Sequence, residues 1–236
     1  MKNIPNLLII CIFSLFATLQ SSVFAQDEEP PIVSALPGYV SSDAVVLFDG
    51  TDLSKWIYTN GKPADWIVAN GEMTVRGGSI VTKENFGDMQ IHLEFCTPVP
   101  ATGEEQGRGN SGVYIHRNYE VQVLDSYENS TYPDGMCGSV YLQHIPLVNA
   151  SRPPGIWQIY DIIFHTARFD ENGNIIKRPT LTVLHNGVLI QDNVEITSPT
   201  GSAKGNEEKL TGPIELQDHR NPVRYRNIWV RPLSPR

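Results

Sequence analysis

From Val45 onward the chain has one texture: short apolar or alternating segments, interrupted about every ten residues by Gly, Pro, Asn or Asp. No segment of convincing length carries the 3.6-residue period of an amphipathic helix, and no internal repeat is present. Short strands at such spacing are typical of a β-sandwich or barrel. We therefore expect an all-β domain over residues 44–236, with about ten to fourteen strands in two packed antiparallel sheets.

Individual strands can be predicted from the alternation of apolar and polar residues. The clearest is 88–97 (DMQIHLEFCT), in which every second residue is apolar, so that one face of the strand suits a core. The pair Asn186-Gly187 predicts a two-residue hairpin turn into a strand at 188–190. Further strands are expected at 112–117, 119–125, 157–166, 179–185, 213–217 and 225–231.

The first 25 residues have the pattern of a secretory signal peptide. Lys2 supplies a positive charge, residues 7–19 are apolar, and Val23 and Ala25 precede a plausible cleavage site. A membrane anchor is the alternative, but the apolar run is shorter than the roughly 20 residues that span a bilayer. We expect export to the periplasm or the medium.

Residues 26–43 are acidic and rich in proline, and we interpret them as a lead-in to the domain. Cleavage would remove Lys2, the only charged residue of the signal, and change the formal net charge from −8 to −9. An acidic chain is a poor partner for nucleic acid or an anionic membrane and suits a neutral or cationic ligand. No later segment is apolar enough to span a bilayer, and the sequence does not determine the oligomeric state.

Two cysteines remain after cleavage, Cys96 and Cys137. Export makes a disulfide possible, although two cysteines fix no framework, and two buried free thiols are the simpler expectation. No Cys/His cluster has the spacing of a zinc site. No cofactor is predicted, and a divalent metal stays an open alternative.

Carboxylates on two strands are the first candidates for chemistry. Glu94 with His92, and Glu120 with Gln122, come from separate strands that could lie side by side. Neighbouring carboxylates can share acid and base work, because like charges raise one pKa and leave the other low. The alternative for both glutamates is a polar network on a solvated sheet face.

Two loops add further polar candidates. The segment 107–112 packs three glycines around Arg108 and Asn110, and Arg108 could donate two hydrogen bonds to a sugar or lie on the surface. Gln217 and His219 stand at the end of another predicted strand. Candidate aromatic and imidazole contacts to a sugar are Tyr114, Tyr119, His144 and Trp157, with core packing as the alternative for the aromatic rings.

Other enzyme classes have little support in the sequence. There is no G-x-S-x-G elbow to make Ser111 a serine-hydrolase nucleophile. Phosphate-binding loops and dinucleotide fingerprints are absent as well.

Several segments together resemble the 3-keto-disaccharide hydrolase-like family, and the likeness spans about residues 44–233. Each piece is short, but their order and spacing are specific. The segments are VLFDGTDLSKW (46–56), GNSGV (109–113), YEVQVLD (119–125), PLVNASR (146–152), WQ (157–158), YD (160–161), GPI (212–214), LQDH (216–219) and YRNI (225–228).

This resemblance implies a concanavalin A-like jelly roll, as in laminarinase-type glucanases. Those enzymes carry a Glu-x-Asp-x-x-Glu strand, whereas the comparable strand here has Gln122 in place of the middle acid and Asp125 in place of the last. Ordinary double-displacement hydrolysis needs two carboxyls about 5 Å apart, so the departure weighs against it.

The family's substrate class implies a different route for a carbohydrate ligand such as an oxidised glucoside or disaccharide. A ketone at C3 acidifies the C2 proton, so that a base can remove it and the C1 substituent can leave by β-elimination, after which water adds to the enone. We interpret Glu120 as the base, Gln122 and Arg108 as holding the sugar or the enolate, and His219 or Asp125 as the acid. Candidate substrate-binding residues are Arg108, Asn110, Glu94, Tyr119, His144, Trp157 and Gln217.

The leading hypothesis is thus an exported carbohydrate-active enzyme that cleaves 3-keto-glycosides or hydrates the derived enone. A non-catalytic carbohydrate-binding domain on the same fold is the first alternative. An ordinary endo-glucanase is the second, and a purely structural exported domain is the third.

Overall fold

The computed structural model describes residues 32–34 and 40–234. The predicted signal peptide lies outside these residues, as does most of the 26–43 lead-in. All strands of the described part lie in the compact unit Val33–Arg236. In that part, no helix is long and apolar enough to cross a bilayer.

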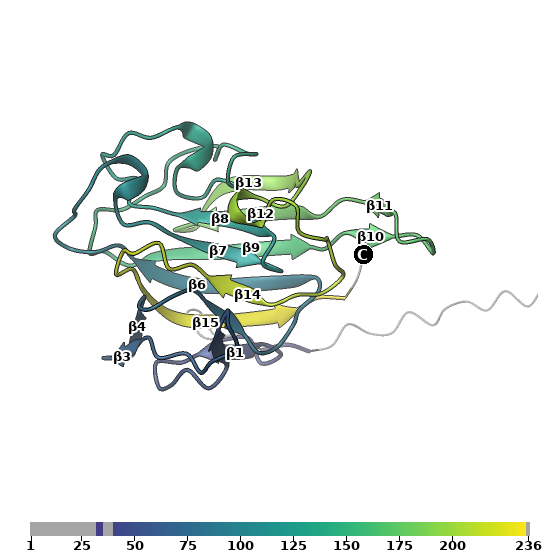
Figure 1. Ribbon diagram of the computed structural model, residues 1–236, viewed down its shortest axis with the longest axis horizontal. Coiled ribbons are helices and arrows are strands. Elements are labelled where there is room, and N and C mark those ends of the chain that lie inside the picture. Colours follow the sequence, from purple (N-terminus) through teal and green to yellow (C-terminus); the bar gives the residue numbers. More distant parts are fainter. Residues whose placement is uncertain (1–31, 35–39, 235–236) are drawn as a thin grey trace, which may run out of the picture. The chain divides into compact units, whose positions relative to one another are not determined.

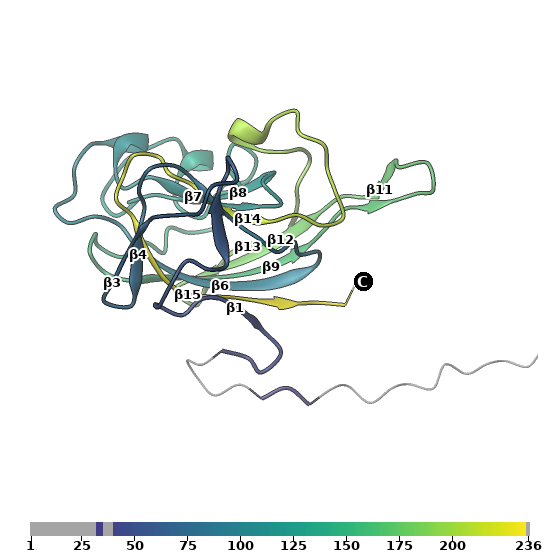
Figure 2. The same ribbon diagram turned by 60° about the horizontal axis from the view of Figure 1, so that its bottom comes forward.

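Two antiparallel sheets form the two layers of a sandwich (Figures 1 and 2). The larger sheet has the order β13-β12-β9-β6-β15-β4-β3, with β1 also paired to β15. Its strands are β1 Val45–Phe48, β3 Ile67–Ala69, β4 Glu72–Thr74, β6 Met89–Cys96, β9 Gln158–His165, β12 Thr180–His185, β13 Val188–Glu195 and β15 Arg224–Pro232.

The smaller sheet has five strands in the order β2-β5-β14-β7-β8. They are β2 Trp56–Tyr58, β5 Ile80–Thr82, β7 Ser111–Ile115, β8 Tyr119–Val123 and β14 Ile214–Leu216. The hairpin of β10 Arg168–Phe169 and β11 Ile175–Lys177 stands apart from both sheets. Three short 3₁₀ turns complete the described elements: η1 Glu105–Gly107, η2 Pro133–Gly135 and η3 Gly201–Ala203.

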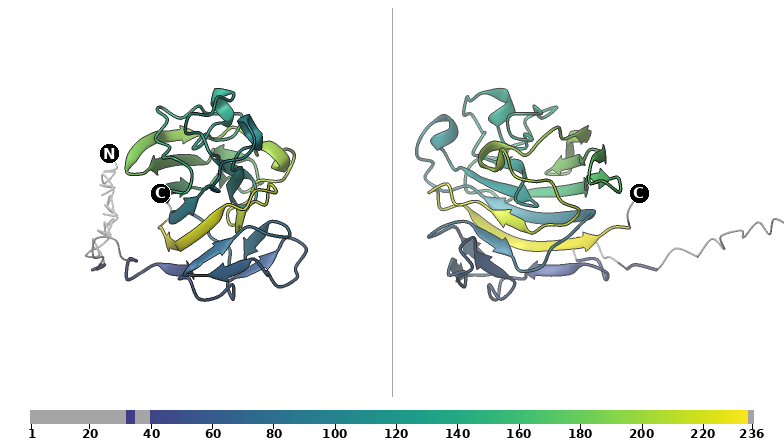
Figure 3. Two further views of the ribbon diagram at one scale, coloured as in Figure 1. Left: turned by 90° about the vertical axis from the view of Figure 1, so that its left-hand side faces the viewer. Right: turned by 45° about the vertical axis from the view of Figure 1, so that its right-hand side comes forward.

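The core lies between the two sheets. Strand β6 runs beside β15, as Figure 3 shows, and its four alternating apolar residues are fully buried while Gln90, His92 and Glu94 face away from the core. From the smaller sheet, Val113 and Val121 are fully buried as well. Complete burial of such a side chain contributes about 1.5–3 kcal/mol, so the alternating pattern is what joins the two layers.

The fold prediction is confirmed: the chain is an all-β jelly-roll sandwich. The Asn186-Gly187 turn has positive φ angles of 54° and 79°, which fits the predicted hairpin between β12 and β13. The strand predicted at 112–117 ends earlier, because His116 and Arg117 take positive φ and form the turn into β8.

Both cysteines of the domain are free and buried, as the simpler expectation had it. Cys137 Sγ lies 3.0 Å from the hydroxyl of Tyr160, and Arg224 Nη2 donates to Cys96 Sγ at 3.1 Å.

Candidate functional site

The outer face of the smaller sheet carries the polar side chains that the core excludes. In β8, Glu120 and Gln122 alternate with core residues, and Tyr114 of β7 lies directly opposite Glu120. Gly112 lies opposite Gln122, and its carbonyl accepts the main-chain N–H of Gln217 at 2.9 Å. The β7–β8 register and the end of β14 therefore place these residues on one surface.

A pocket of ≈ 490 Å³ lies over this surface. The sheet supplies its floor, and the segments that contain η1 and η3 lie on the same outer side (Figure 2). The lining residues are Gln106, Asn110, Tyr114, Glu120, Gln122, Tyr141, Leu142, Gly201, Ser202, Gln217 and His219. Six of the residues predicted from the sequence are thus brought together: Asn110, Tyr114, Glu120, Gln122, Gln217 and His219.

Glu120 supplies the one carboxyl group among the lining residues. Its side chain is deep in the wall, since the residue is 3% exposed, and Tyr114 donates from its hydroxyl to Glu120 Oε2 at 2.7 Å. Burial raises the pKa of Glu120 to about 7, because the ionised form loses solvation, while the Tyr114 hydrogen bond opposes the rise. A carboxyl with this pKa is available both as a base and as an acid near neutral pH.

Two glycines make room for this carboxyl. A Cβ at Gly112 would lie 2.4 Å from Glu120 Oε1, which is closer than real Cβ contacts. On the other side, a Cβ at Gly201 would lie 3.1 Å from Glu120 Oε2 and 3.3 Å from the Tyr114 hydroxyl, and Gly201 has a positive φ of 47°. Glycine at both positions lets strand and loop close on the carboxyl.

The amide donors of the pocket are bonded within the protein. Gln122 Nε2 donates to Gln106 Oε1 at 2.9 Å, and Gln106 Nε2 donates to Thr131 Oγ1 and to the carbonyl of Gly135, both at 2.8 Å. Asn110 Nδ2 donates to the carbonyl of Gln106 at 2.7 Å.

Two amide acceptors have no such partner. Among the described residues, no donor reaches the buried Oε1 of Gln122 or of Gln217. Both atoms are fully buried, so they are internal acceptors behind the pocket surface and are not open to a ligand. The polar groups that line the pocket, among them the hydroxyls of Tyr141 and Ser202 and the imidazole of His219, match a ligand rich in hydroxyl groups.

The rim of the pocket is polar on one side and more apolar on another. His219 is exposed at one side. Tyr141 and the 53% exposed Leu142 form a more apolar part, and the Tyr141 hydroxyl lies 2.6 Å from that of Tyr132.

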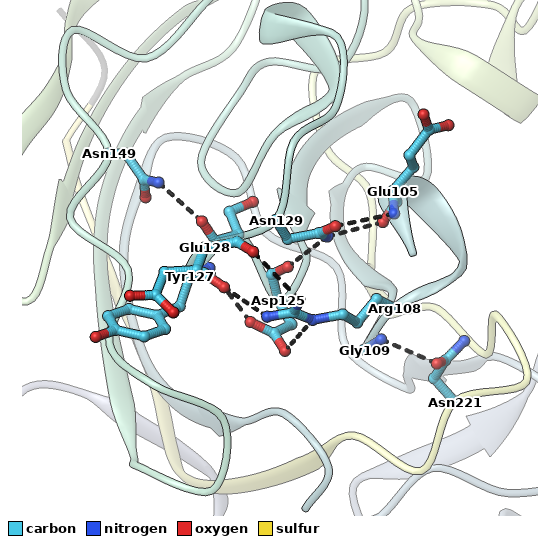
Figure 4. Close-up of polar contacts among 10 residues, drawn as sticks. Glu105, Arg108, Gly109, Asp125, Tyr127, Glu128, Asn129, Asn149 and Asn221 are labelled. Carbon is cyan, nitrogen blue, oxygen red and sulfur yellow. Dashed lines mark hydrogen bonds and ion pairs between the residues drawn. The ribbon is translucent and has the colours of Figure 1, made fainter. Parts of the chain in front are cut away.

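Arg108 and Asp125, two residues predicted for the site, instead connect two loops outside the pocket lining (Figure 4). Arg108 Nε donates to Asp125 Oδ2 at 2.7 Å, and Asp125 Oδ1 accepts the main-chain N–H of Tyr127 at 3.2 Å. Asn129 adds bonds from its side chain to the main chain of Glu105 and Asp125. This network holds the loop that contains Gln106 and Asn110 against the segment that follows β8.

Tyr119 and His144 also lie away from the pocket lining. Tyr119 is 1% exposed and packs against Phe164 in the core, with ring centroids 5.7 Å apart. His144 Nε2 lies 2.7 Å from the carbonyl oxygen of Glu195. Their contacts are those of structural residues.

Glu94 belongs to the other sheet, and Trp157 directly precedes β9 of that sheet. The strands of Glu94 and Glu120, which the sequence allowed to lie side by side, are not neighbours, because β6 is central in the larger sheet and β8 is an edge strand of the smaller one. Glu94 accepts from Arg226 Nε at 2.7 Å and faces away from the core. The Arg226 guanidinium lies 4.1 Å from the Trp157 ring centroid.

Sequence reasoning did not assign a site role beyond stacking to Tyr114, and it missed Gln106, Tyr141 and Ser202. The turn at 116–118 offered a signal for Tyr114, because a hairpin centred there pairs residue 114 with residue 120. The other three come from loops whose approach to the sheet has no local pattern. In the described part of the chain, no group of three His, Cys, Asp or Glu side chains is arranged to hold a metal ion.

Comparison with known proteins agrees with this fold. A solved structure from Parabacteroides distasonis, described as a proposed glycosyl hydrolase, is 42% identical, covers 95% of this chain and 100% of its own, and has a TM-score of 0.81. A second from the same organism, with the same description, is 19% identical, covers 81% and 94%, and has a TM-score of 0.62, which shows the fold alone. Among proteins with curated descriptions, none matches this chain.

The fold and its relatives define a carbohydrate-active protein of the jelly-roll class. Residues 43–231 match the 3-keto-alpha-glucoside-1,2-lyase-like domain, and the chain belongs to that family.

Proposed function

We propose that this protein cleaves 3-keto-glycosides, with Glu120 as the base that removes the C2 proton. The observation that carries the proposal is a pocket whose lining contains one carboxyl, 3% exposed, with a pKa of about 7. Abstraction of a proton next to a ketone needs one such base, whereas double displacement needs a second carboxyl about 5 Å away.

The reaction balances as an elimination followed by a hydration. Glu120 takes the C2 proton, the electron pair forms an enolate with the C3 oxygen, and the C1–O bond breaks to give the enone. The leaving oxygen takes up a proton. Water then adds its hydroxyl at C1 and a proton at C2, which releases the 3-keto sugar.

The remaining roles follow from contacts. His219 is the candidate acid for the leaving oxygen, since it lines the pocket and Asp125 does not. Both amide hydrogens of Gln122 are used within the protein, one by Gln106 Oε1 at 2.9 Å and one by the carbonyl of Gly135 at 3.4 Å, so Gln122 holds Gln106 in place and is not the donor to the enolate oxygen. The hydroxyls of Tyr141 and Ser202 are the candidate donors to the enolate oxygen.

The polar lining supports a sugar as the ligand. Tyr141, Ser202 and His219 line the pocket with groups that can donate or accept hydrogen bonds, as sugar hydroxyls also can. The same feature suits a binding module, so turnover is what separates the two functions.

Product analysis by mass spectrometry tests the proposal directly. The purified protein is incubated with a 3-keto-glucoside and, in parallel, with the unoxidised parent glucoside. Release of the aglycone from the keto form alone, abolished in a folded Glu120→Gln variant, is the expected result. Cleavage of the parent would contradict the proposal in favour of ordinary hydrolysis, and turnover of neither would favour a binding function.

We also propose that the protein is exported with removal of residues 1–25. The basis is the apolar run at 7–19 followed by Val23 and Ala25. Amino-terminal sequencing of the mature protein should begin at Gln26, and retention of Met1 would contradict the proposal.

A further inference from the structure

Tyr114 is the residue in direct contact with the proposed base. It projects from β7 opposite Glu120, is 3% exposed, and donates to Glu120 Oε2 at 2.7 Å. Because both groups are buried, this bond is formed where water competes little for either partner.

The hydroxyl of Tyr114 has three polar neighbours but one hydrogen to donate. Ser202 Oγ lies at 3.3 Å, and Gln217 Nε2 donates to the Tyr114 oxygen at 3.4 Å. Gln217 is a donor, so Ser202 Oγ and the carboxylate are the two acceptors. The carboxylate is the closer of them and the charged one, so the hydrogen goes to Glu120. Burial beside Glu120 also raises the pKa of Tyr114 well above its usual value, which keeps the hydroxyl protonated as a donor.

The two oxygens of Glu120 therefore have different surroundings. Oε2 is held by Tyr114 and lies against Gly201, whereas Oε1 lies over Gly112. Without the Tyr114 hydroxyl, the carboxylate could rotate about its last torsion, which is a soft one.

We propose that Tyr114 is a positioning residue, which holds Glu120 Oε2 so that Oε1 is the atom that takes the proton. The inference rests on the proposed role of Glu120 as the base. Tyr114 itself need not touch the reacting carbon, and its effect passes through the orientation and the charge of one carboxylate.

Other ionisable groups around Glu120 have to be considered in a titration. Glu215 of β14 acts on it as a like charge, and Arg117 donates to Glu215 at 2.9 Å. Tyr141 and His219 line the same pocket from two loops. Among the contacts of the described residues, none of these four groups donates a hydrogen bond to the Glu120 carboxylate. Removing the Tyr114 hydroxyl therefore removes the hydrogen bond to Glu120 Oε2 and leaves these four groups in place.

Tyr114→Phe tests the inference through the pH dependence of turnover. Loss of the hydroxyl is expected to lower kcat about tenfold at pH 7, to leave KM within about twofold, and to move the ascending limb of the pH profile up by about 1 unit. About fivefold of the loss comes from the smaller ionised fraction of Glu120 and should disappear above that midpoint, whereas the roughly twofold part that comes from lost orientation should remain at every pH. Tyr141→Phe is the matched control, because its hydroxyl contacts Tyr132 instead, and its midpoint should stay at the wild-type value.

Carboxyl ¹³C NMR titration of Glu120 gives a readout that needs no turnover. The Glu120 resonance should titrate at higher pH in Tyr114→Phe than in the wild type, and an equal midpoint in the two proteins overturns the inference. A loss expressed in KM alone overturns it as well. A fully active Glu120→Gln variant would refute the base assignment itself, whereas an inactive Glu120→Gln beside an unshifted Tyr114→Phe would refute only the positioning role.

Discussion

Gly112→Ala is the sharpest perturbation of the proposed site, because it adds one methyl group beneath the carboxyl of Glu120. The new Cβ would lie 2.4 Å from Glu120 Oε1, 3.1 Å from Cδ and 3.2 Å from Cγ. Ordinary contact begins at about 3.5 Å, so Oε1 has to move by roughly 1 Å. Gly112 does not have a positive φ, so an alanine backbone is not strained there and the effect is confined to the side chain.

The magnitude follows from that displacement. A misplacement of about 1 Å in a catalytic group costs about 100-fold in rate. For stability, moving the carboxyl weakens the bond from Tyr114, which costs about 1.5–3 kcal/mol for a charged acceptor, while alanine in a strand regains about 0.5–1 kcal/mol over glycine. We expect a net loss of about 1–2 kcal/mol, so the variant stays folded.

The assay compares kcat/KM on a 3-keto-glucoside with the free energy of unfolding from denaturant titration. Gly107→Ala is the matched control, since a Cβ there meets nothing within 4 Å and Gly107 also lacks a positive φ. A folded Gly112→Ala protein with kcat/KM within about threefold of the wild type would refute the argument that the placement of Oε1 matters.

Three further results are expected. Because burial raises the pKa of Glu120 from 4.5 to about 7 in the folded protein, the stability linked to its protonation is complete below pH 4.5 and is lost as the pH rises through 7. Glu120→Gln should therefore exceed the wild type in stability at pH 8 by up to about 3 kcal/mol, with the gap closing toward pH 5 in denaturant titrations; a gap that does not vary with pH would contradict this. Asp125→Asn should lower the free energy of unfolding by about 3 kcal/mol, because it breaks the buried ion pair with Arg108, and should keep kcat within about tenfold of the wild type. Loss of turnover at an unchanged Tm would instead indicate that Asp125 acts in catalysis. Glu94→Gln should turn over 3-keto-glucoside at the wild-type rate, and a rate loss like that of Glu120→Gln would contradict its placement on the other sheet.

Much of the fold could be predicted because its determinants are local. The alternation in 88–97 states which face of β6 is buried, and the Asn186-Gly187 turn fixes a hairpin by the conformational freedom of two residues. Both features can be predicted without information on which elements the strands pack against. The same reasoning defined β8, where Glu120 and Gln122 alternate with valines.

The pairing of strands far apart in the chain could not be predicted in the same way. Glu94 and Glu120 are both polar residues on alternating strands, and nothing local states that β6 lies between β15 and β9 while β8 pairs with β7. Their pairing is decided by the closure of long loops and by the packing of whole sheets. The sequence therefore left the pairing of Glu94 with Glu120 open, and the structure rules it out.

Loop side chains present a different difficulty, since the same residue type can serve a ligand or the protein. Arg108 was expected to meet a sugar because it stands among glycines, yet its donors go to Asp125 and to the carbonyl of Tyr127. The glycines let the loop come close to the segment after β8, and a buried carboxylate there needs a cation. Only the fold shows whether Arg108 binds a ligand or pairs with Asp125.

The departure from the glucanase strand acquires a physical meaning in the pocket. With an acid in place of Gln122, two carboxyls would face the same buried space from one strand, and their repulsion would push one pKa up while it left the other low. The amide removes that coupling, and its donor is used to hold Gln106. Glu120 is then the one carboxyl that lines the pocket, and burial, Tyr114 and the more distant Glu215 together set its pKa. A pocket with one carboxyl suits the proposed removal of a proton from an already acidified carbon, and it lacks the second carboxyl, about 5 Å away, that double displacement uses.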